Sequence, residues 1–116
     1  MVGLITALGA GGGTSSYREV EDADVIVLWG SNAREAHPIF FHHVLAAKRK
    51  GARLYVIDPR RTATARFADS WIGLRVGTDI AFLAGVINYM ISNDKVHMDY
   101  VKAYTNASFL ISGDFK

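Results

Sequence analysis

Three short polar segments contain most of the side chains that could recognise a ligand. Each follows a run of apolar residues, and each combines glycine or proline with hydroxyl, amide, carboxylate or guanidinium groups. The segments are residues 30–35, 58–62 and 77–79. Such groups donate and accept hydrogen bonds, and guanidinium groups pair with phosphates. Because no nucleophile stands in a pattern with a base, we predict ligand binding at these segments and no catalytic residue.

The first segment reads GSNARE and lies between a predicted strand and a predicted helix. Gly30 lets the backbone approach a ligand closely, while Ser31, Asn32 and Glu35 supply donors and acceptors at the start of the helix. The same residues would also serve as an ordinary helix cap. The sequence leaves both interpretations open.

The second segment, DPRRT, consists of Asp58, Pro59, Arg60, Arg61 and Thr62. It follows the second strand of a predicted βαβ unit, where an acidic residue commonly accepts hydrogen bonds from ribose hydroxyls. The planar guanidinium groups of its two arginines are suited to phosphates. The alternative interpretation is a solvated turn.

The third segment consists of Gly77, Thr78 and Asp79. The Asp79 carboxylate could accept two hydrogen bonds from the N1–H and N2 amino edge of guanine, whereas adenine has no such pair of donors. The alternative is that Asp79 is an ordinary N-cap of the following helix, with Gly77 in the turn.

Other polar features give weaker signals. His42 and His43 are adjacent and belong to no H-E-x-x-H pattern, so they predict packing or surface roles and no metal site. The glycine-rich residues 9–16 lack the lysine of a phosphate-binding loop, which favours a flexible loop. Residues 48–50 are a basic helix end. With no cysteine, the sequence provides no disulfide, thiolate-bound zinc or iron–sulfur cluster.

Charge and hydropathy exclude some classes of partner. The net charge of +2 comes from 13 basic and 11 acidic residues, which is too even a balance for a dedicated nucleic-acid-binding protein. No apolar run reaches the roughly 18 residues of a membrane span, and residues 1–10 lack the basic region of a signal peptide. We therefore expect no nucleic-acid partner and no direct membrane span, while the compartment stays undetermined.

The predicted elements place these segments at the ends of strands. Residues 24–30 form a continuous apolar run of strand length, residues 38–50 have helical spacing, and residues 53–58 form a second strand closed by Pro59. Strand, helix and strand make a βαβ unit. Since ligands bind at the carboxyl ends of the strands in such sheets, we expect the three segments to converge there.

The second half of the sequence continues the same pattern. A short helix is expected over residues 62–68, a third strand over 71–76, a helix capped by Asp79 over 79–93 and another over 98–104. We therefore predict an α/β fold: a Rossmann-like parallel sheet of about three to four strands flanked by helices. Residues 1–116 are expected to form one domain, with a glycine-rich lead-in (1–20), a βαβ core (21–93) and a C-terminal helix and tail (94–116).

The chain is apolar for its size. With glycine counted and tyrosine left out, the apolar share is roughly 55%, above the usual value of about 45 to 50%. A small domain also has little interior in which to bury such residues. We therefore expect part of the surface to pack against other polypeptide.

Three stretches, taken in order, resemble the molybdopterin oxidoreductase family and within it the catalytic subunits of formate dehydrogenases: GSNAREAHPIFFHHV, AKRKGARLYVIDPRRTATARFAD and GLRVGTDIAFL. The stretch YVKAYTNASFL is similar to the corresponding part of respiratory formate dehydrogenases. The resemblance extends from Gly3 to about Phe115. It implies that the chain is a fragment of a larger multidomain subunit.

The resemblance also implies a cofactor, bis(molybdopterin guanine dinucleotide) carrying Mo or W. Gly30, Ser31, Asn32 and Glu35 would line its diphosphate and ribose. The five residues from Asp58 to Thr62 would contact the ribose and phosphate side, and Gly77, Thr78 and Asp79 the guanine. Two positions depart from the family pattern. Ala33 replaces a frequent proline, and Ser15 replaces a frequent asparagine, which weakens any contact of Thr14 and Ser15 with the pterin.

The complete enzyme, by resemblance, oxidises formate to CO2 or runs the reverse. Its metal-ligating Cys or selenocysteine and its iron–sulfur cysteines would precede the part that matches Gly3, so an iron–sulfur cluster belongs to the parent subunit and not to these residues. The expected partners are the remainder of the catalytic subunit, an iron–sulfur electron-transfer subunit and formate. Two alternatives stay open: a non-catalytic scaffold subunit of an electron-transfer complex, and a free-standing Rossmann-like nucleotide-binding module.

Overall fold

The computed structural model describes residues 5, 6, 9, 13 and 15–105. Most of the predicted glycine loop and the tail from residue 106 onward lie outside the described residues. The chain separates into two compact units, Met1–Val76 and Gly77–Lys116, and each is considered by itself below. The prediction of one continuous domain therefore stays a prediction.

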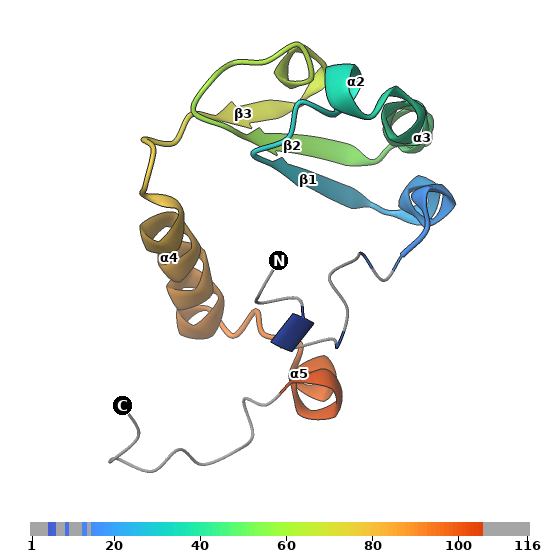
Figure 1. Ribbon diagram of the computed structural model, residues 1–116. Helices are drawn as coiled ribbons and strands as arrows, with labels where there is room; N and C mark the ends of the chain where they lie inside the picture. The colour runs from blue at the N-terminus through green and yellow to red at the C-terminus, as the bar shows by residue number, and fades with distance from the viewer. Residues whose placement is uncertain (1–4, 7–8, 10–12, 14, 106–116) are drawn as a thin grey trace. The chain divides into compact units, whose positions relative to one another are not determined.

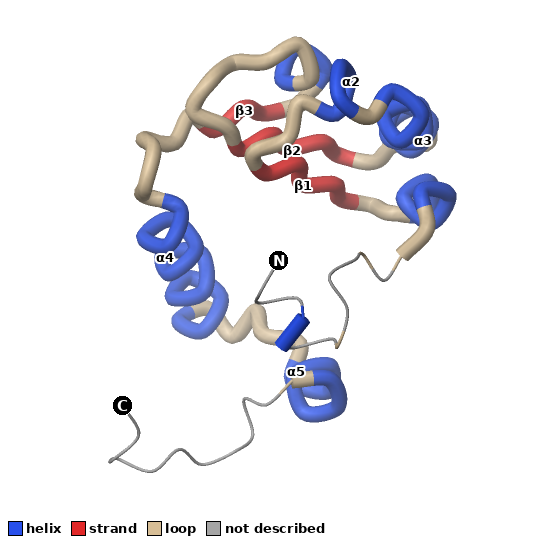
Figure 2. The backbone as a smooth tube through the Cα atoms, viewed as in Figure 1, coloured by secondary structure: helices blue, strands red, loops and turns tan. Residues whose placement is uncertain are grey.

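The first unit is built on a parallel three-stranded sheet (Figures 1 and 2). Its strands are β1 (Val25–Trp29), β2 (Arg53–Ile57) and β3 (Ser70–Ile72), with β2 in the middle. Trp29 lies opposite Ile57, and Ile57 lies opposite Ile72, so all three strands end at the same edge. The predicted α/β fold with a parallel sheet is confirmed.

Helices cover one face of this sheet. The main one is α3 (Pro38–Arg49), while α2 (Ala33–Ala36) and the 3-10 helix η2 (Ala65–Phe67) are short. All three helices contribute to one core with the alternate residues of β1 and β2. The buried core residues include Ile26, Leu28, Ala33, Phe41, Val44, Ala47, Leu54, Val56 and Ala65. The fully buried Leu54 and Val56 place the centre of this core on β2.

The third strand is shorter than predicted. The alternating pattern suggested pairing over residues 71–76, but β3 begins at Ser70 and ends at Ile72. Its partner β2 ends at Ile57 because Asp58 turns the chain and Pro59 has no N–H to donate. The Trp71 indole N–H instead donates to the Asp58 carbonyl at 2.9 Å. Pairing stops where the neighbouring strand stops, which a single-strand pattern does not reveal.

One element was not predicted. The 3-10 helix η1 (Tyr17–Asp22) spans the predicted boundary between the lead-in (1–20) and the core (21–93), and it packs on α3. The ring centroids of Tyr17 and Phe40 lie 5.2 Å apart. The Glu21 carboxylate lies 2.7 Å from His43 Nδ1 and 3.3 Å from Lys50 Nζ. These contacts pack η1 against α3 and its C-cap Lys50, and a local bond from the Ser16 N–H to Glu19 Oε2 at 3.1 Å stabilises the start of η1.

The other face of the sheet is open in the first unit. Val25 and Val27 on β1 are 57% and 50% exposed, although parallel sheets are normally covered on both faces. In the second unit, α4 (Asp79–Ser92) and α5 (Met98–Tyr104) contain no buried residue. The apolar stripe of α4 is exposed at Ile80, Leu83, Val86, Ile87, Met90 and Ile91. Each of these apolar surfaces is uncovered within its own unit.

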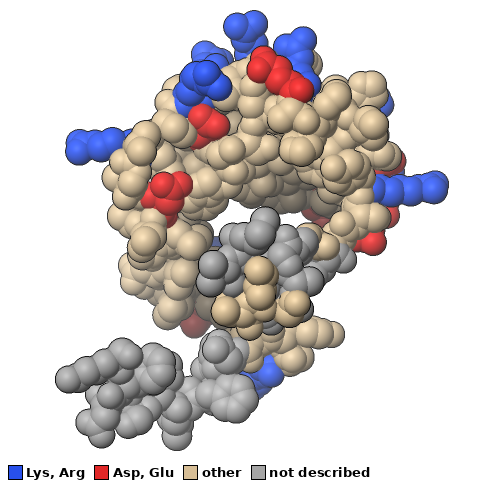
Figure 3. Space-filling view, in the orientation of Figure 1, with Lys and Arg blue, Asp and Glu red and all other residues tan. Residues whose placement is uncertain are grey.

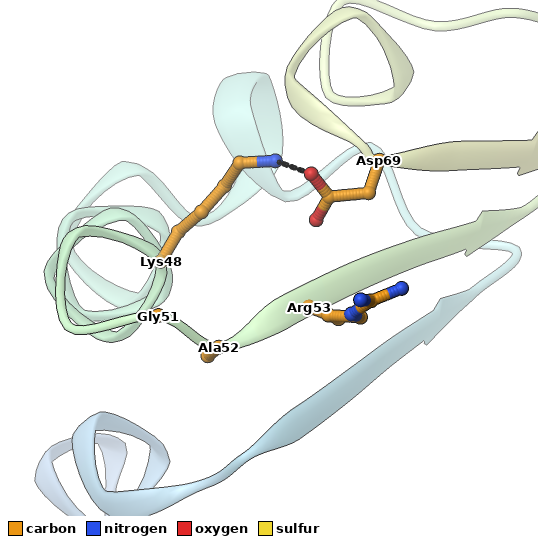
Figure 4. Close-up of a pocket in the computed structure, with 5 residues that line it drawn as sticks. All are labelled: Lys48, Gly51, Ala52, Arg53 and Asp69. Atoms are coloured by element: carbon orange, nitrogen blue, oxygen red, sulfur yellow. Dashed lines mark hydrogen bonds and ion pairs between the residues drawn. The ribbon is translucent and has the colours of Figure 1, made fainter.

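An ion pair joins α3 to the start of β3 (Figure 4). Lys48 Nζ lies 2.6 Å from Asp69 Oδ1, and Asp69 Oδ2 accepts the Leu54 backbone N–H at 2.8 Å. The hydrogen bond from Lys48, followed by that from Leu54, lowers the pKa of the Asp69 carboxyl below its usual value. The charged carboxylate is therefore the form that supports the folded state.

We expect the first unit to become less stable in acid. A carboxyl whose pKa is lower in the folded chain stabilises the fold above its unfolded pKa, about 3.9 for aspartate. That contribution is lost as the pH falls through the lower folded value. The temperature of half-unfolding should therefore decrease less steeply below about pH 4 in Asp69→Asn than in the parent protein. Asp22→Asn, which changes an 88% exposed side chain, is the control. Equal acid profiles for Asp69→Asn and the parent would contradict this expectation.

Candidate nucleotide-binding edge

The first polar segment begins at Gly30, directly after β1. The Gly30 N–H donates to the Ile57 carbonyl at 2.8 Å, which joins the ends of β1 and β2. Its φ of +59° lies in the left-handed region that favours glycine. A Cβ added there would meet no atom within 4 Å. The required conformation, together with open space beside it, leaves room for a ligand to approach the backbone.

Asn32 occupies the N-cap of α2, but its side chain makes no capping hydrogen bond. Its Nδ2 donates to Glu35 Oε2 at 2.6 Å, and its Oδ1 accepts from the Thr64 hydroxyl at 2.9 Å. The capping interpretation is therefore right about the position of Asn32 and wrong about its side chain. Sequence reasoning missed Thr64, because nothing in the TATA stretch distinguishes it from the neighbouring Thr62.

The second segment forms a tight turn after β2. Asp58 Oδ1 accepts the Arg60 N–H at 2.8 Å, and the Asp58 N–H donates to the Ile72 carbonyl at 3.1 Å. Thr62 is only 5% exposed, and its hydroxyl accepts the Ala65 N–H at 3.4 Å. The Asp58 carboxylate thus shapes the turn that carries the arginines, while the Thr62 side chain supports it from inside.

Positive charge gathers along this edge. Figure 3 shows Lys and Arg side chains grouped at the top of the view, over the connections that follow β1 and β2, with acidic side chains among them. The exposed arginines of these connections are Arg34, Arg60, Arg61 and Arg66. Arg34 lies over the Phe67 ring at 5.2 Å, and Arg61 lies 6.0 Å from the Trp71 ring. The combination of guanidinium groups and backbone N–H groups suits an anionic ligand such as a diphosphate.

The third segment belongs to the second unit. Gly77 has a φ of +84°, Thr78 is the N-cap of α4, and Asp79 is its first residue. The prediction that Asp79 caps the helix is wrong, because the chain enters the helix one residue earlier. An exposed carboxylate in a first turn is favoured by the helix dipole. Because this segment lies in the other unit, its convergence with the first two stays a prediction.

The opposite edge of the sheet has a different character. A pocket there is lined by Lys48, Gly51, Ala52, Arg53 and Asp69, at the amino ends of β2 and β3 (Figure 4). Its lysine is paired with its aspartate, so the group serves to join α3 to the sheet. Across the described ranges, no group of three or more His, Cys, Asp or Glu side chains could hold a metal ion. None of the described helices is long and apolar enough to cross a membrane.

The parallel topology and the polar carboxyl edge define a Rossmann-like α/β fold, a class in which ligands commonly bind at that edge. The family model of the molybdopterin oxidoreductases matches residues 7–106, and the chain therefore belongs to the molybdopterin oxidoreductase family. The resemblance inferred from the three motif stretches is confirmed.

Two relatives are formate dehydrogenase subunits. The chain is 45% identical over 113 residues to the major subunit of the nitrate-inducible formate dehydrogenase of Escherichia coli. It is 43% identical over 112 residues to the formate dehydrogenase subunit alpha of Megalodesulfovibrio gigas. Each match covers 97% of this chain and 11% of the relative. The chain thus spans about a ninth of the length of these subunits.

Two solved structures resemble the chain. Acetylene hydratase from Pelobacter acetylenicus matches with a TM-score of 0.60 and 27% identity, over 75% of this chain and 14% of that one. A Sir2 homologue in complex with 2'-O-acetyl ADP ribose matches with a TM-score of 0.53 and 29% identity, over 66% of this chain and 30% of that one. Both likenesses agree with the parallel α/β arrangement.

Proposed function

We propose that this chain is part of the catalytic subunit of a molybdenum or tungsten formate dehydrogenase. In this role it binds the guanine dinucleotide end of the bis(molybdopterin guanine dinucleotide) cofactor. The parent enzyme converts formate to CO2, or the reverse, and exchanges two electrons with iron–sulfur clusters of its own and of a partner subunit. The formate assignment is supported by the 45% identity to a formate dehydrogenase subunit. Acetylene hydratase shows that a similar fold also occurs in an enzyme with another substrate.

The observation that carries the nucleotide proposal is the juxtaposition of the first two polar segments. The Gly30 N–H to Ile57 bond and the Thr64 to Asn32 bond join the first segment to residues on either side of the second, at the carboxyl edge. A diphosphate fits the exposed Arg60 and Arg61 guanidinium groups, and ribose hydroxyls fit the Asp58 carboxylate. The ADP ribose compound bound by the Sir2 homologue has the same two chemical groups, a ribose and a diphosphate.

Within this proposal the chain binds and orients, and it transfers neither protons nor electrons. The metal and its pterins supply the redox chemistry once bound. The Asn32 amide and the Asp58 carboxylate hold polar oxygens of the nucleotide, and the guanidinium groups neutralise its charge. The Asp79 carboxylate accepts the paired N–H donors of guanine and so distinguishes guanine from adenine.

The test of the proposal replaces Asp79 in the complete subunit. Asp79→Ala removes the acceptor of two guanine donors. Hydrogen bonds to a charged group contribute about 1.5 to 3 kcal/mol each, so the loss of two of them should weaken binding of the cofactor at least about a hundredfold. Guanine nucleotide and metal are quantified per subunit after purification.

Asp99→Ala is the matched control, because Asp99 also lies in the first turn of a helix of the second unit. We expect the control to keep its full guanine content. Equal guanine and metal content in Asp79→Ala and the control would count against the guanine assignment.

A further inference from the structure

Thr64 is a polar side chain that is completely buried, with 0% exposure. It lies between β2 and η2 at the N-cap of η2, but its side chain makes no capping bond there. The hydroxyl accepts the Arg34 backbone N–H at 2.9 Å and donates to Asn32 Oδ1 at 2.9 Å. Both partners belong to the segment that follows β1, about thirty residues earlier. The Thr64 side chain therefore hydrogen-bonds to that segment and not to its own helix.

These bonds determine the orientation of the Asn32 amide. The Thr64 oxygen accepts the Arg34 N–H, and its own hydrogen is donated to the amide oxygen of Asn32. The Glu35 carboxylate accepts only, so it faces Nδ2, at 2.6 Å. An amide nitrogen has two hydrogens, and the bond to Glu35 uses one. The side chain is therefore held from both sides with its second N–H at a fixed angle.

We propose that Thr64 is a positioning residue for nucleotide binding, acting through Asn32. By fixing the Asn32 amide, it presents the second Nδ2 hydrogen as a donor to a phosphate or ribose oxygen. Its two hydrogen bonds also hold the segment after β1 beside the connection that follows β2. Thr64 does not touch the ligand, because it is buried. This inference rests on the proposed function, since it requires that the carboxyl edge binds a nucleotide.

The experiment uses the complete, cofactor-loaded subunit with Thr64→Val and Thr64→Ser, each in the parent and in an Asn32→Ala background. The rate at which guanine nucleotide is lost from the protein is measured, together with the thermal midpoint. Thr64→Val keeps the size of the side chain and removes the hydroxyl, so nucleotide loss should be about fivefold to tenfold faster. Thr64→Ser keeps the hydroxyl and should release nucleotide at nearly the parent rate.

The Asn32→Ala background separates positioning from general stability. If Thr64 acts through Asn32, Thr64→Val adds no further acceleration once the amide is gone. If Thr64 only supports the fold, the acceleration is the same in both backgrounds, which would overturn the inference. Should Thr64→Val fail to fold, Thr64→Cys replaces it, because a thiol is similar in size and a weak donor. Release by Thr64→Cys at the Thr64→Ser rate would then overturn the inference.

The same data distinguish the two proposals. Faster loss in Asn32→Ala with a parent-like rate in Thr64→Val rejects the positioning role of Thr64 and leaves the nucleotide site intact. A parent-like rate in Asn32→Ala rejects the assignment of the first polar segment to the nucleotide, and the positioning role is rejected with it.

Discussion

Replacing Leu54 with alanine is expected to unfold the first unit or bring it close to unfolding. Leu54 is fully buried on the middle strand of the sheet and lies opposite Ile26 of β1. Truncation of a buried leucine costs about 2 to 5 kcal/mol, because it removes apolar contacts and leaves a cavity. Domains are stable by only about 5 to 15 kcal/mol in total. A small unit with a single thin core has little stability to lose.

The effect is measured as the urea concentration at which half of the complete subunit becomes sensitive to a short protease pulse. Ile39→Ala is the matched control, since Ile39 is also a large aliphatic residue of the first unit but is 71% exposed. We expect a large decrease of the midpoint for Leu54→Ala and a small change for the control. Equal midpoints would show that the core is not centred on β2.

Removing both Arg60 and Arg61 should weaken retention of the cofactor more than any single change at this edge. Each guanidinium group is exposed next to the Asp58 turn, and charge-assisted bonds to phosphate contribute about 1.5 to 3 kcal/mol each. The double variant Arg60→Ala, Arg61→Ala is therefore expected to bind at least about a hundredfold more weakly.

A control of equal charge is available at the opposite edge. The double variant Arg49→Ala, Arg53→Ala also removes two positive charges, but from the amino end of the sheet, and it should retain the guanine nucleotide. The corresponding lysine variants, Arg60→Lys and Arg61→Lys, keep the charge and lose the planar fork, so we expect intermediate retention. Similar nucleotide loss in both alanine pairs would indicate a general effect of charge and contradict the assignment of the phosphates to this edge.

Much of the first unit could be predicted because its local signals agree with its tertiary structure. The apolar run before Gly30 corresponds to β1, the helical spacing after Pro38 corresponds to α3, and the run closed by Pro59 corresponds to β2. Gly30 and Pro59 follow the ends of the two strands, and Pro38 begins the helix, for backbone reasons that act locally. Parallel pairing then brings the ends of β1 and β2 together, as expected for a βαβ unit.

The features that were missed depend on contacts between distant segments. The length of β3 is set by the end of β2, and Glu21 and Tyr17 of η1 contact His43 and Phe40 of α3. Thr64 could not be singled out, because its partners lie 30 and 32 residues away. The sequence indicated that the first two polar segments lie at the carboxyl edge. It did not indicate which buried hydroxyl holds the first of them in position.

Hydrogen exchange of the complete subunit, prepared with and without the cofactor, shows whether a guanine nucleotide binds at the carboxyl ends of the strands. We expect slower exchange with cofactor at the backbone amides of residues 30–35, 58–62 and 77–79, and unchanged exchange at residues 51–53. Protection at residues 51–53 with none at residues 30–35 would place the nucleotide at the opposite edge of the sheet.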